Sequence, residues 1–78
     1  MKHRPLSTIA QEIEQAWNNV YFAARPYLSA MHRLHHVDDM YYNEDGRDIV
    51  LYFLSNASTW RGEKAREIKA ELKEIMMI

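Results

Sequence analysis

Residues 49–54 read IVLYFL, and the structure that this stretch adopts decides the fold of the chain. Its β-branched and aromatic residues favour a strand, so a buried strand is one interpretation. No other segment offers such a strand a partner, however, and apolar residues recur three and four apart from Ile49 to Ala57. We therefore predict a helix from Glu44 to about Ser55. Because it is apolar on nearly every side, we expect it to be the central helix of a bundle.

Three further segments have helical periodicity. Between the first two, Pro26 disfavours helix geometry at Arg25 and suits the first turn of a new helix. A single long helix kinked at Pro26 is the alternative. The predicted fold class is all-α, a small bundle of three to four helices in a single domain (residues 1–78), with residues 1–7 as an N-terminal arm. The predicted helices are Thr8–Ala24, Pro26–His36, Glu44–Ser55 and Trp60–Met76, with a loop at Val37–Asp45.

The composition limits the classes of function. The 78 residues include 10 basic and 11 acidic side chains, a formal net charge of −1, and no cysteine. Without cysteine there is no disulfide framework, Cys-ligated zinc or thiol nucleophile, and the chain fits a reducing cytoplasm. The near-neutral charge is not typical of a nucleic-acid binder. We also expect no signal peptide and no membrane span, because no apolar run approaches about 18 residues.

A histidine group is the sharpest local feature. His32 and His36 are four residues apart and would share one face of a helix, with Asp39 one turn further along. Two imidazoles and a carboxylate could hold zinc. The metalloprotease pattern, however, needs a glutamate directly after the first histidine, and Arg33 stands there. We favour a polar helix end whose cationic histidines suit the negative end of the helix dipole, and we predict no metal and no cofactor.

An acidic segment with two adjacent tyrosines follows the histidines. Residues 38–48 carry five carboxylates. A calcium loop centred on Gly46 would place Tyr41 and Tyr52 at its first and last ligand positions, which excludes an EF-hand. The segment could imitate nucleic acid or dock on a basic partner, and a plain acidic capped loop is the alternative. The candidate partner-binding residues are Tyr41, Tyr42, Glu44 and Asp45, with Trp60 and Arg61 as a second choice.

Basic residues on the last predicted helix raise a second function. Arg61, Lys64 and Lys69 could contact phosphates in a small DNA-binding regulator. Glutamates alternate with them, however, and reduce the positive field that phosphate binding needs. DNA binding is therefore the alternative to a protein-interaction module.

Catalysis has no support in the sequence. The serines lack a glycine-flanked elbow, and there is no Gly-rich phosphate loop. We therefore predict a non-enzymatic protein. The number of tyrosines fits a protein–protein interface, and the apolar C-terminal residues Met76, Met77 and Ile78 could pair two copies of the chain as a homodimer.

Most of the chain resembles a group of short helical proteins of bacterial phages and mobile genetic elements. The segment Ile49–Leu72 (IVLYFLSNASTWRGEKAREIKAEL) carries most of the likeness, and residues 9–10 (IA), 19–22 (NVYF) and 26–28 (PYL) add to it. No activity is attached to this group, so no residue role is carried over. The resemblance implies a bacterial or phage setting. Small proteins of such elements often block a host protein, including CRISPR effectors, and in that context we expect an inhibitor.

Overall fold

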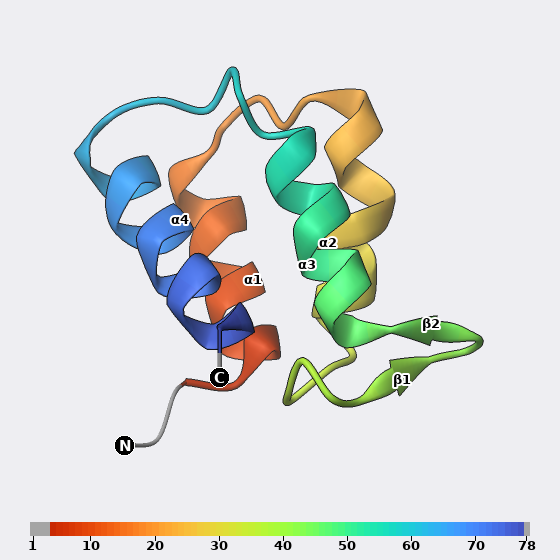
Figure 1. Cartoon of the computed structure of the whole chain (residues 1–78). Helices are drawn as coiled ribbons and strands as arrows, with labels where there is room; N and C mark the ends of the chain where they lie inside the picture. The colour runs from red at the N-terminus through yellow and green to blue at the C-terminus, as the bar shows by residue number, and fades with distance from the viewer. Residues whose placement is uncertain (1–3, 78) are drawn as a thin grey trace.

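The computed structural model describes residues 4–77, and within them the chain forms four helices and one short hairpin (Figure 1). The helices contact one another in a closed ring, because α1 packs on α2, α2 on α3, α3 on α4, and α4 on α1. The predicted fold class is thus confirmed in its helical part, while the hairpin makes it not purely all-α. The elements are α1 (Leu6–Ala16), η1 (Phe22–Ala24, a 3-10 turn), α2 (Arg25–Met31), β1 (Met40–Tyr41), β2 (Glu44–Asp45), α3 (Gly46–Ser55) and α4 (Glu63–Met76).

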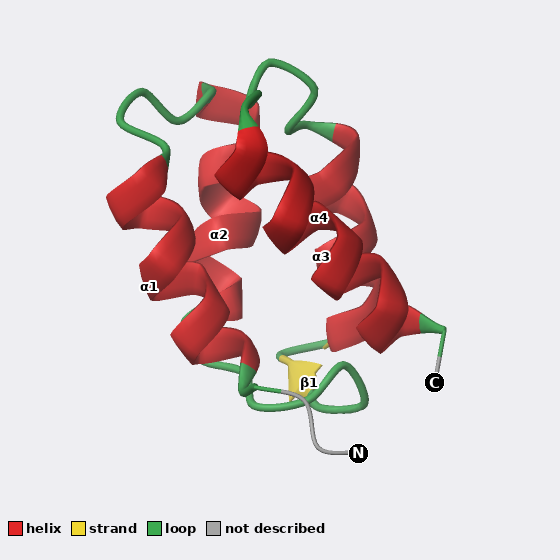
Figure 2. Cartoon of the chain, turned by 90° about the vertical axis from the view of Figure 1, so that its left-hand side faces the viewer, coloured by secondary structure: helices red, strands yellow, loops and turns green. Residues whose placement is uncertain are grey.

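The core lies inside this ring and is wholly apolar among the described residues. Each helix contributes one stripe, as the three-and-four spacing of the apolar residues requires. The hairpin lies at one end of the bundle, and the connections 17–21 and 56–62 lie together at the other (Figures 1 and 2). The largest fully buried side chains are Leu6, Ile9, Ile13, Met31, Leu34, Ile49, Val50, Phe53, Ile68 and Leu72.

The first helix ends at Ala16, so the prediction of a helix to Ala24 was wrong. Trp17 takes an extended backbone and turns into the core, where its ring stacks on that of Trp60 with centroids 5.4 Å apart. Asn18 and Asn19 follow in a turn, a conformation that their side chains favour over a helix interior. The apolar spacing therefore continued past the point where the backbone leaves the helix.

The first helix begins at Leu6, two residues before the predicted start, and no side chain caps it. Instead, the Leu6 N–H donates to the carbonyl oxygen of His35 (3.0 Å), and the Ser7 N–H donates to that of Leu34 (2.9 Å). Two of the N–H groups that a helix start leaves unpaired are thus satisfied by a distant backbone segment. Residues 4–7 consequently belong to the folded domain, whereas residues 1–3 of the predicted arm lie outside the described residues.

The same segment explains why α2 ends at Met31 instead of the predicted His36. The Asp39 side chain reaches back, and its Oδ2 accepts hydrogen bonds from the backbone N–H groups of His35 (3.1 Å) and His36 (3.0 Å). In an α-helix these N–H groups would donate to carbonyls four residues earlier. An aspartate side chain thus replaces the helical partners and stops the helix.

The predicted loop Val37–Asp45 contains an antiparallel hairpin in which Met40 pairs with Asp45 and Tyr41 with Glu44. The third predicted helix is confirmed within two residues at its start. Its N-cap is Asp45, whose Oδ1 accepts the Arg47 N–H at 3.0 Å. Asn43 lies at the hairpin turn.

The last helix begins at Glu63, three residues after the predicted start. Its cap, Gly62, has a φ of 112°, which a residue with a side chain rarely adopts. Residues 57–62 therefore form an irregular connection, and this is where Trp60 enters the core.

Arg4 ties the start of the described chain to two helices. Its guanidinium bonds both carboxylate oxygens of Glu12, at 3.0 and 3.2 Å, and both of Glu71, at 3.0 and 2.6 Å. Lys64 adds a longer contact to Glu12 at 3.8 Å. The hydrogen bonds from Arg4 lower the pKa of Glu12, while the two glutamates raise that of Arg4. One half-exposed arginine thus joins α1 and α4.

We expect Arg4→Gln to lower the free energy of unfolding by about 1 kcal/mol at neutral pH, because water screens a half-exposed network of this kind. The lowered pKa of Glu12 stabilises the fold above the unfolded-state value of about 4.3, and this contribution is lost as the pH falls through the folded-state pKa. Urea unfolding should therefore show the difference between the two proteins shrinking below about pH 4. A difference independent of pH would contradict an ionic role for Arg4.

Candidate interaction surface at the hairpin

The hairpin extends from the end of the bundle beside the start of α3 (Figure 1). We call residues Met40–Asp45 the hairpin surface. Tyr41 is half-buried and packs against the core, whereas Tyr42 at the turn is 85% exposed. The two rings meet edge to face, with centroids 4.8 Å apart. Met40 is also exposed, at 60%. The inner tyrosine anchors the hairpin, and the outer one faces solvent.

Tyr42 occupies an unusual backbone position. Its φ is 57°, in the left-handed region, and it is the first residue of a two-residue turn between paired strands. Glycine normally occupies such a position, because a side chain there costs about 1–2 kcal/mol. The ring is almost wholly exposed, so burial of the tyrosine offsets little of this cost. The backbone is therefore strained at the residue whose aromatic ring is exposed at the tip.

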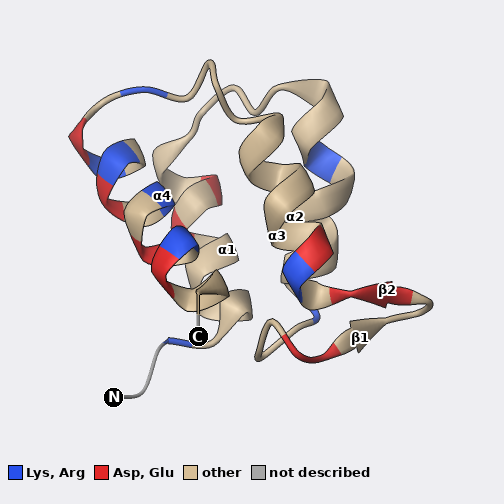
Figure 3. Ribbon diagram, viewed as in Figure 1, with Lys and Arg blue, Asp and Glu red and all other residues tan. Residues whose placement is uncertain are grey.

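The surroundings of the hairpin are acidic. Figure 3 shows acidic residues on β2, in the segment before β1, and at the start of α3. Asp38, Glu44 and Asp48 are exposed, whereas Asp45 is half-buried because it caps α3. Arg47 lies among them, and it bonds the Asp38 carboxylate (3.2 Å) and the carbonyl oxygen of Met76 (3.2 Å). This arginine therefore fixes the hairpin base to the end of α4.

The three candidate metal ligands do not converge. The Oδ2 atom of Asp39 is occupied by backbone N–H groups, which lower the pKa of that carboxyl, the His36 N–H more than that of His35. His32 lies beside α1, with its Nε2 atom 3.1 Å from Oε2 of Glu14. His36 is exposed in the connection that follows α2. Among residues 4–77, no group of three or more His, Asp or Glu side chains is placed to hold a metal ion.

The contact between His32 and Glu14 is close but badly oriented. The two atoms are within ion-pair distance, yet the buried Nε2 atom has no partner of hydrogen-bond geometry among the described residues. The short distance alone does not make this a strong bond, because the strength of a hydrogen bond falls steeply with misalignment. His32 is therefore a packed side chain beside a carboxylate rather than half of a strong ion pair.

The basic residues named for DNA binding are only partly grouped. Lys69 donates from Nζ to the carbonyl oxygen of Trp60 at 2.7 Å, and burial lowers its pKa, with smaller contributions from Lys73 and Arg61. Lys64 faces Glu12 on another side of α4. Arg61 and Lys69 are thus close enough to repel, but Lys69 is engaged with the backbone. DNA binding stays a prediction.

Of the two residues chosen second as partner-binding candidates, one is buried and the other is exposed. Trp60 is only 5% exposed, because its indole stacks on Trp17 inside the core, while Arg61 is exposed. Trp60 is therefore a core residue that a partner does not reach in this fold. Met40 is an exposed member of the hairpin surface that the sequence-based selection left out, although its hydrophobic character inside a polar segment was a signal.

Comparison of the chain with protein-family models, curated proteins and solved structures finds no match. In the part of the chain that the structure describes, no helix is both long and apolar enough to cross a bilayer.

Proposed function

We propose that this protein is a non-enzymatic interaction module that docks on a basic surface of a protein partner through its hairpin surface. The observation that carries the proposal is Tyr42, an almost fully exposed aromatic ring on a strained backbone. Strain of this kind persists where function selects it, since stability alone would favour glycine at the turn. The ring is held at the tip by the half-buried Tyr41 beneath it.

The chemistry of the hairpin surface defines the partner. Tyrosine is enriched among the residues that contribute most to protein interfaces, and its ring can pack on an arginine as well as in an apolar hollow. Exposed Glu44 beside the tip favours lysine and arginine around that hollow. The partner should therefore present a basic rim around a small apolar depression.

The biological setting of the proposal comes from the sequence resemblance to phage and mobile-element proteins. It supports a cytoplasmic inhibitor of a host protein such as a CRISPR effector, whose nucleic-acid-binding grooves are basic. An acidic hairpin with an aromatic tip suits such a groove. A homodimer through Met77, which is exposed, stays a separate prediction.

We expect Tyr42→Gly to abolish partner capture without destabilising the fold. Glycine relieves about 1–2 kcal/mol of left-handed strain and costs about 0.5–1 kcal/mol through the freer unfolded chain, so the free energy of unfolding should hold or rise. Removal of a central tyrosine should weaken binding more than about tenfold. Urea unfolding measures the first effect, and affinity capture from a bacterial lysate measures the second.

The matched control is Phe22→Ala, which removes an exposed aromatic ring outside the hairpin. It should retain every protein that the wild type captures. Glu44→Lys should lose the partner as well, because it places a positive charge against a basic rim. Capture that survives both Tyr42→Gly and Glu44→Lys would refute the hairpin as the docking site.

A further inference from the structure

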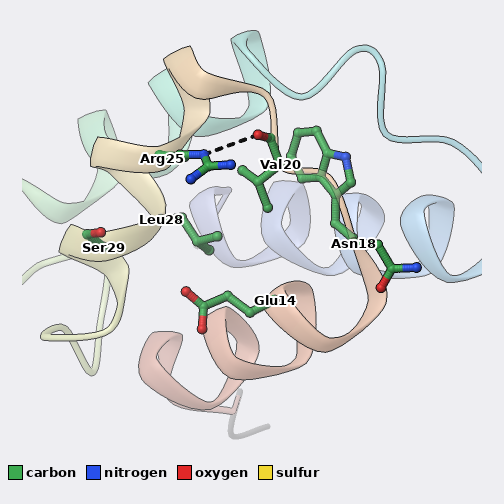
Figure 4. Close-up of a pocket in the computed structure, with 7 residues that line it drawn as sticks. Glu14, Asn18, Val20, Arg25, Leu28 and Ser29 are labelled. Atoms are coloured by element: carbon green, nitrogen blue, oxygen red, sulfur yellow. Dashed lines mark hydrogen bonds between the residues drawn. The ribbon is translucent and has the colours of Figure 1, made fainter.

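A pocket of about 350 Å³ opens between the end of α1 and residues 25–29 of α2 (Figure 4). This volume is at the lower end of the range for small-molecule sites. None of the residues that line the pocket belongs to the hairpin. The lining is more polar than apolar, and its apolar part comes from Trp17 and Leu28, both nearly buried, and the half-buried Val20. The pocket exists because α1 stops at Ala16 and the chain then crosses to α2 as an irregular connection.

Two opposite charges lie on different sides of this lining. In Figure 4 the guanidinium of Arg25 lies on the α2 side beside Val20, and the carboxylate of Glu14 rises from α1 toward Leu28. Arg25 is held by a hydrogen bond from its Nε to the carbonyl oxygen of Val20 (3.2 Å). No acidic side chain of the described residues forms an ion pair with Arg25. The bond fixes the guanidinium through one nitrogen and leaves its two terminal nitrogens for a ligand.

Two uncharged polar side chains complete the lining. Asn18 and Ser29 are exposed, and neither side chain makes a hydrogen bond to another described residue. Polar groups that converge on a small apolar patch can orient a small ligand. Here they comprise one cation, one anion and two neutral groups able to donate or accept.

We propose that this pocket binds an apolar α-amino carboxylate, either a free amino acid or the C-terminal residue of a peptide. The ligand carboxylate pairs with Arg25, whose planar fork matches two carboxylate oxygens. The adjacent nitrogen faces Glu14, and the side chain packs on Leu28, Val20 and Trp17. The negative charge of Glu14 would repel a phosphate dianion. A purely apolar ligand would pair with neither Arg25 nor Glu14. The site is independent of the hairpin and of its partner.

L-leucine titrated into the ¹⁵N-labelled protein tests the proposal by chemical-shift changes. We expect shifts at the amides of Asn18, Val20 and Leu28 and at the Trp17 indole, with a dissociation constant on the order of 1 mM for a ligand of this size. Leucinamide, which lacks the carboxylate, should bind at least about tenfold more weakly. N-acetyl-leucine separates the two sources: equal or tighter binding identifies a peptide C-terminus, and weaker binding identifies a free amino acid.

The matched variants are Arg25→Gln and Arg33→Gln. Both remove an exposed arginine, but Arg33 does not line the pocket. Arg25→Gln should weaken leucine binding about tenfold, and Arg33→Gln should leave it unchanged. The proposal is overturned if about 10 mM leucine shifts none of the pocket signals, or if leucinamide binds the wild type as well as leucine does. These two outcomes need no variant, so they hold even if Arg25→Gln fails to fold.

Discussion

Gly46→Ala is expected to lower the free energy of unfolding by about 2–4 kcal/mol, although it replaces glycine with the best helix former at the start of α3. A Cβ at this position would stand 2.9 Å from the carbonyl oxygen of Val37 and 3.0 Å from those of His36 and Asp39. These are backbone atoms, which cannot rotate away. The Gly46 N–H also donates to the backbone carbonyl oxygen of Asp39 at 2.8 Å, and moving the helix to relieve the clash would break this bond.

Asp48→Ala is the control for Gly46→Ala, because it changes an exposed residue in the same helical turn. Asp48→Ala should lower the free energy of unfolding by less than about 1 kcal/mol, the contribution of an acidic side chain near a helix start. Urea unfolding of both variants measures the difference. Equal stability of Gly46→Ala and wild type would show that α3 and residues 36–39 do not approach as closely as the structure has them.

Trp60→Ala should cost about 3–5 kcal/mol, because truncating a buried tryptophan leaves a cavity and removes the stack on Trp17. A core of this size rarely supplies more than about 3–5 kcal/mol in total. The variant is therefore expected to be largely unfolded at 25 °C. Circular dichroism and the loss of amide dispersion in the NMR spectrum would report this directly.

The comparison with Arg61→Ala separates a core role from a contact role. Arg61 is the next residue and is exposed, so its truncation should change the free energy of unfolding by less than about 0.5 kcal/mol. Loss of partner capture by Trp60→Ala would then reflect unfolding alone. A folded Trp60→Ala of wild-type stability would instead place the indole at the surface, contrary to the structure.

The sequence predicted the elements whose signals are local. Residues 46–55 formed the expected helix despite their β-propensity, because burial of Ile49, Val50 and Phe53 on one face outweighs an intrinsic preference of this size. Leu51 and Tyr52 of the same run are exposed, so the helix is not apolar all round. The last helix ends at Met76, as predicted. Its interleaved acidic and basic residues indicated the outer face.

The elements that were missed depend on contacts far along the chain. Apolar spacing carried the first predicted helix to Ala24, but the core takes Trp17 from an extended backbone instead. The second ended early because Asp39 captures the N–H groups of His35 and His36. The hairpin lacks the glycine that usually marks such a turn, so its tyrosine–asparagine turn gave no recognisable signal.

The candidate partner-binding residues occupy different places in the fold, which the sequence could not distinguish. Tyr41 and Tyr42 were selected because they are aromatic residues in an acidic segment. In the structure, Tyr41 packs against the core and Tyr42 is exposed. Trp60 was also selected as an aromatic residue and lies in the core. Composition cannot separate these cases, because aromatic residues serve both cores and interfaces. The pocket beside Arg25 was invisible, since it forms only where the expected helix is broken.

The start of α1 has one more consequence, for the order of folding. Its first two N–H groups are satisfied by the carbonyl oxygens of Leu34 and His35. A growing chain that has not yet added these residues lacks the partners that close the helix start, and a helix of eleven residues is marginal on its own. The first helix in the sequence is therefore not an early, independent unit. We expect it to form together with the turn after α2, in keeping with the cooperative folding that is usual for a domain of this size.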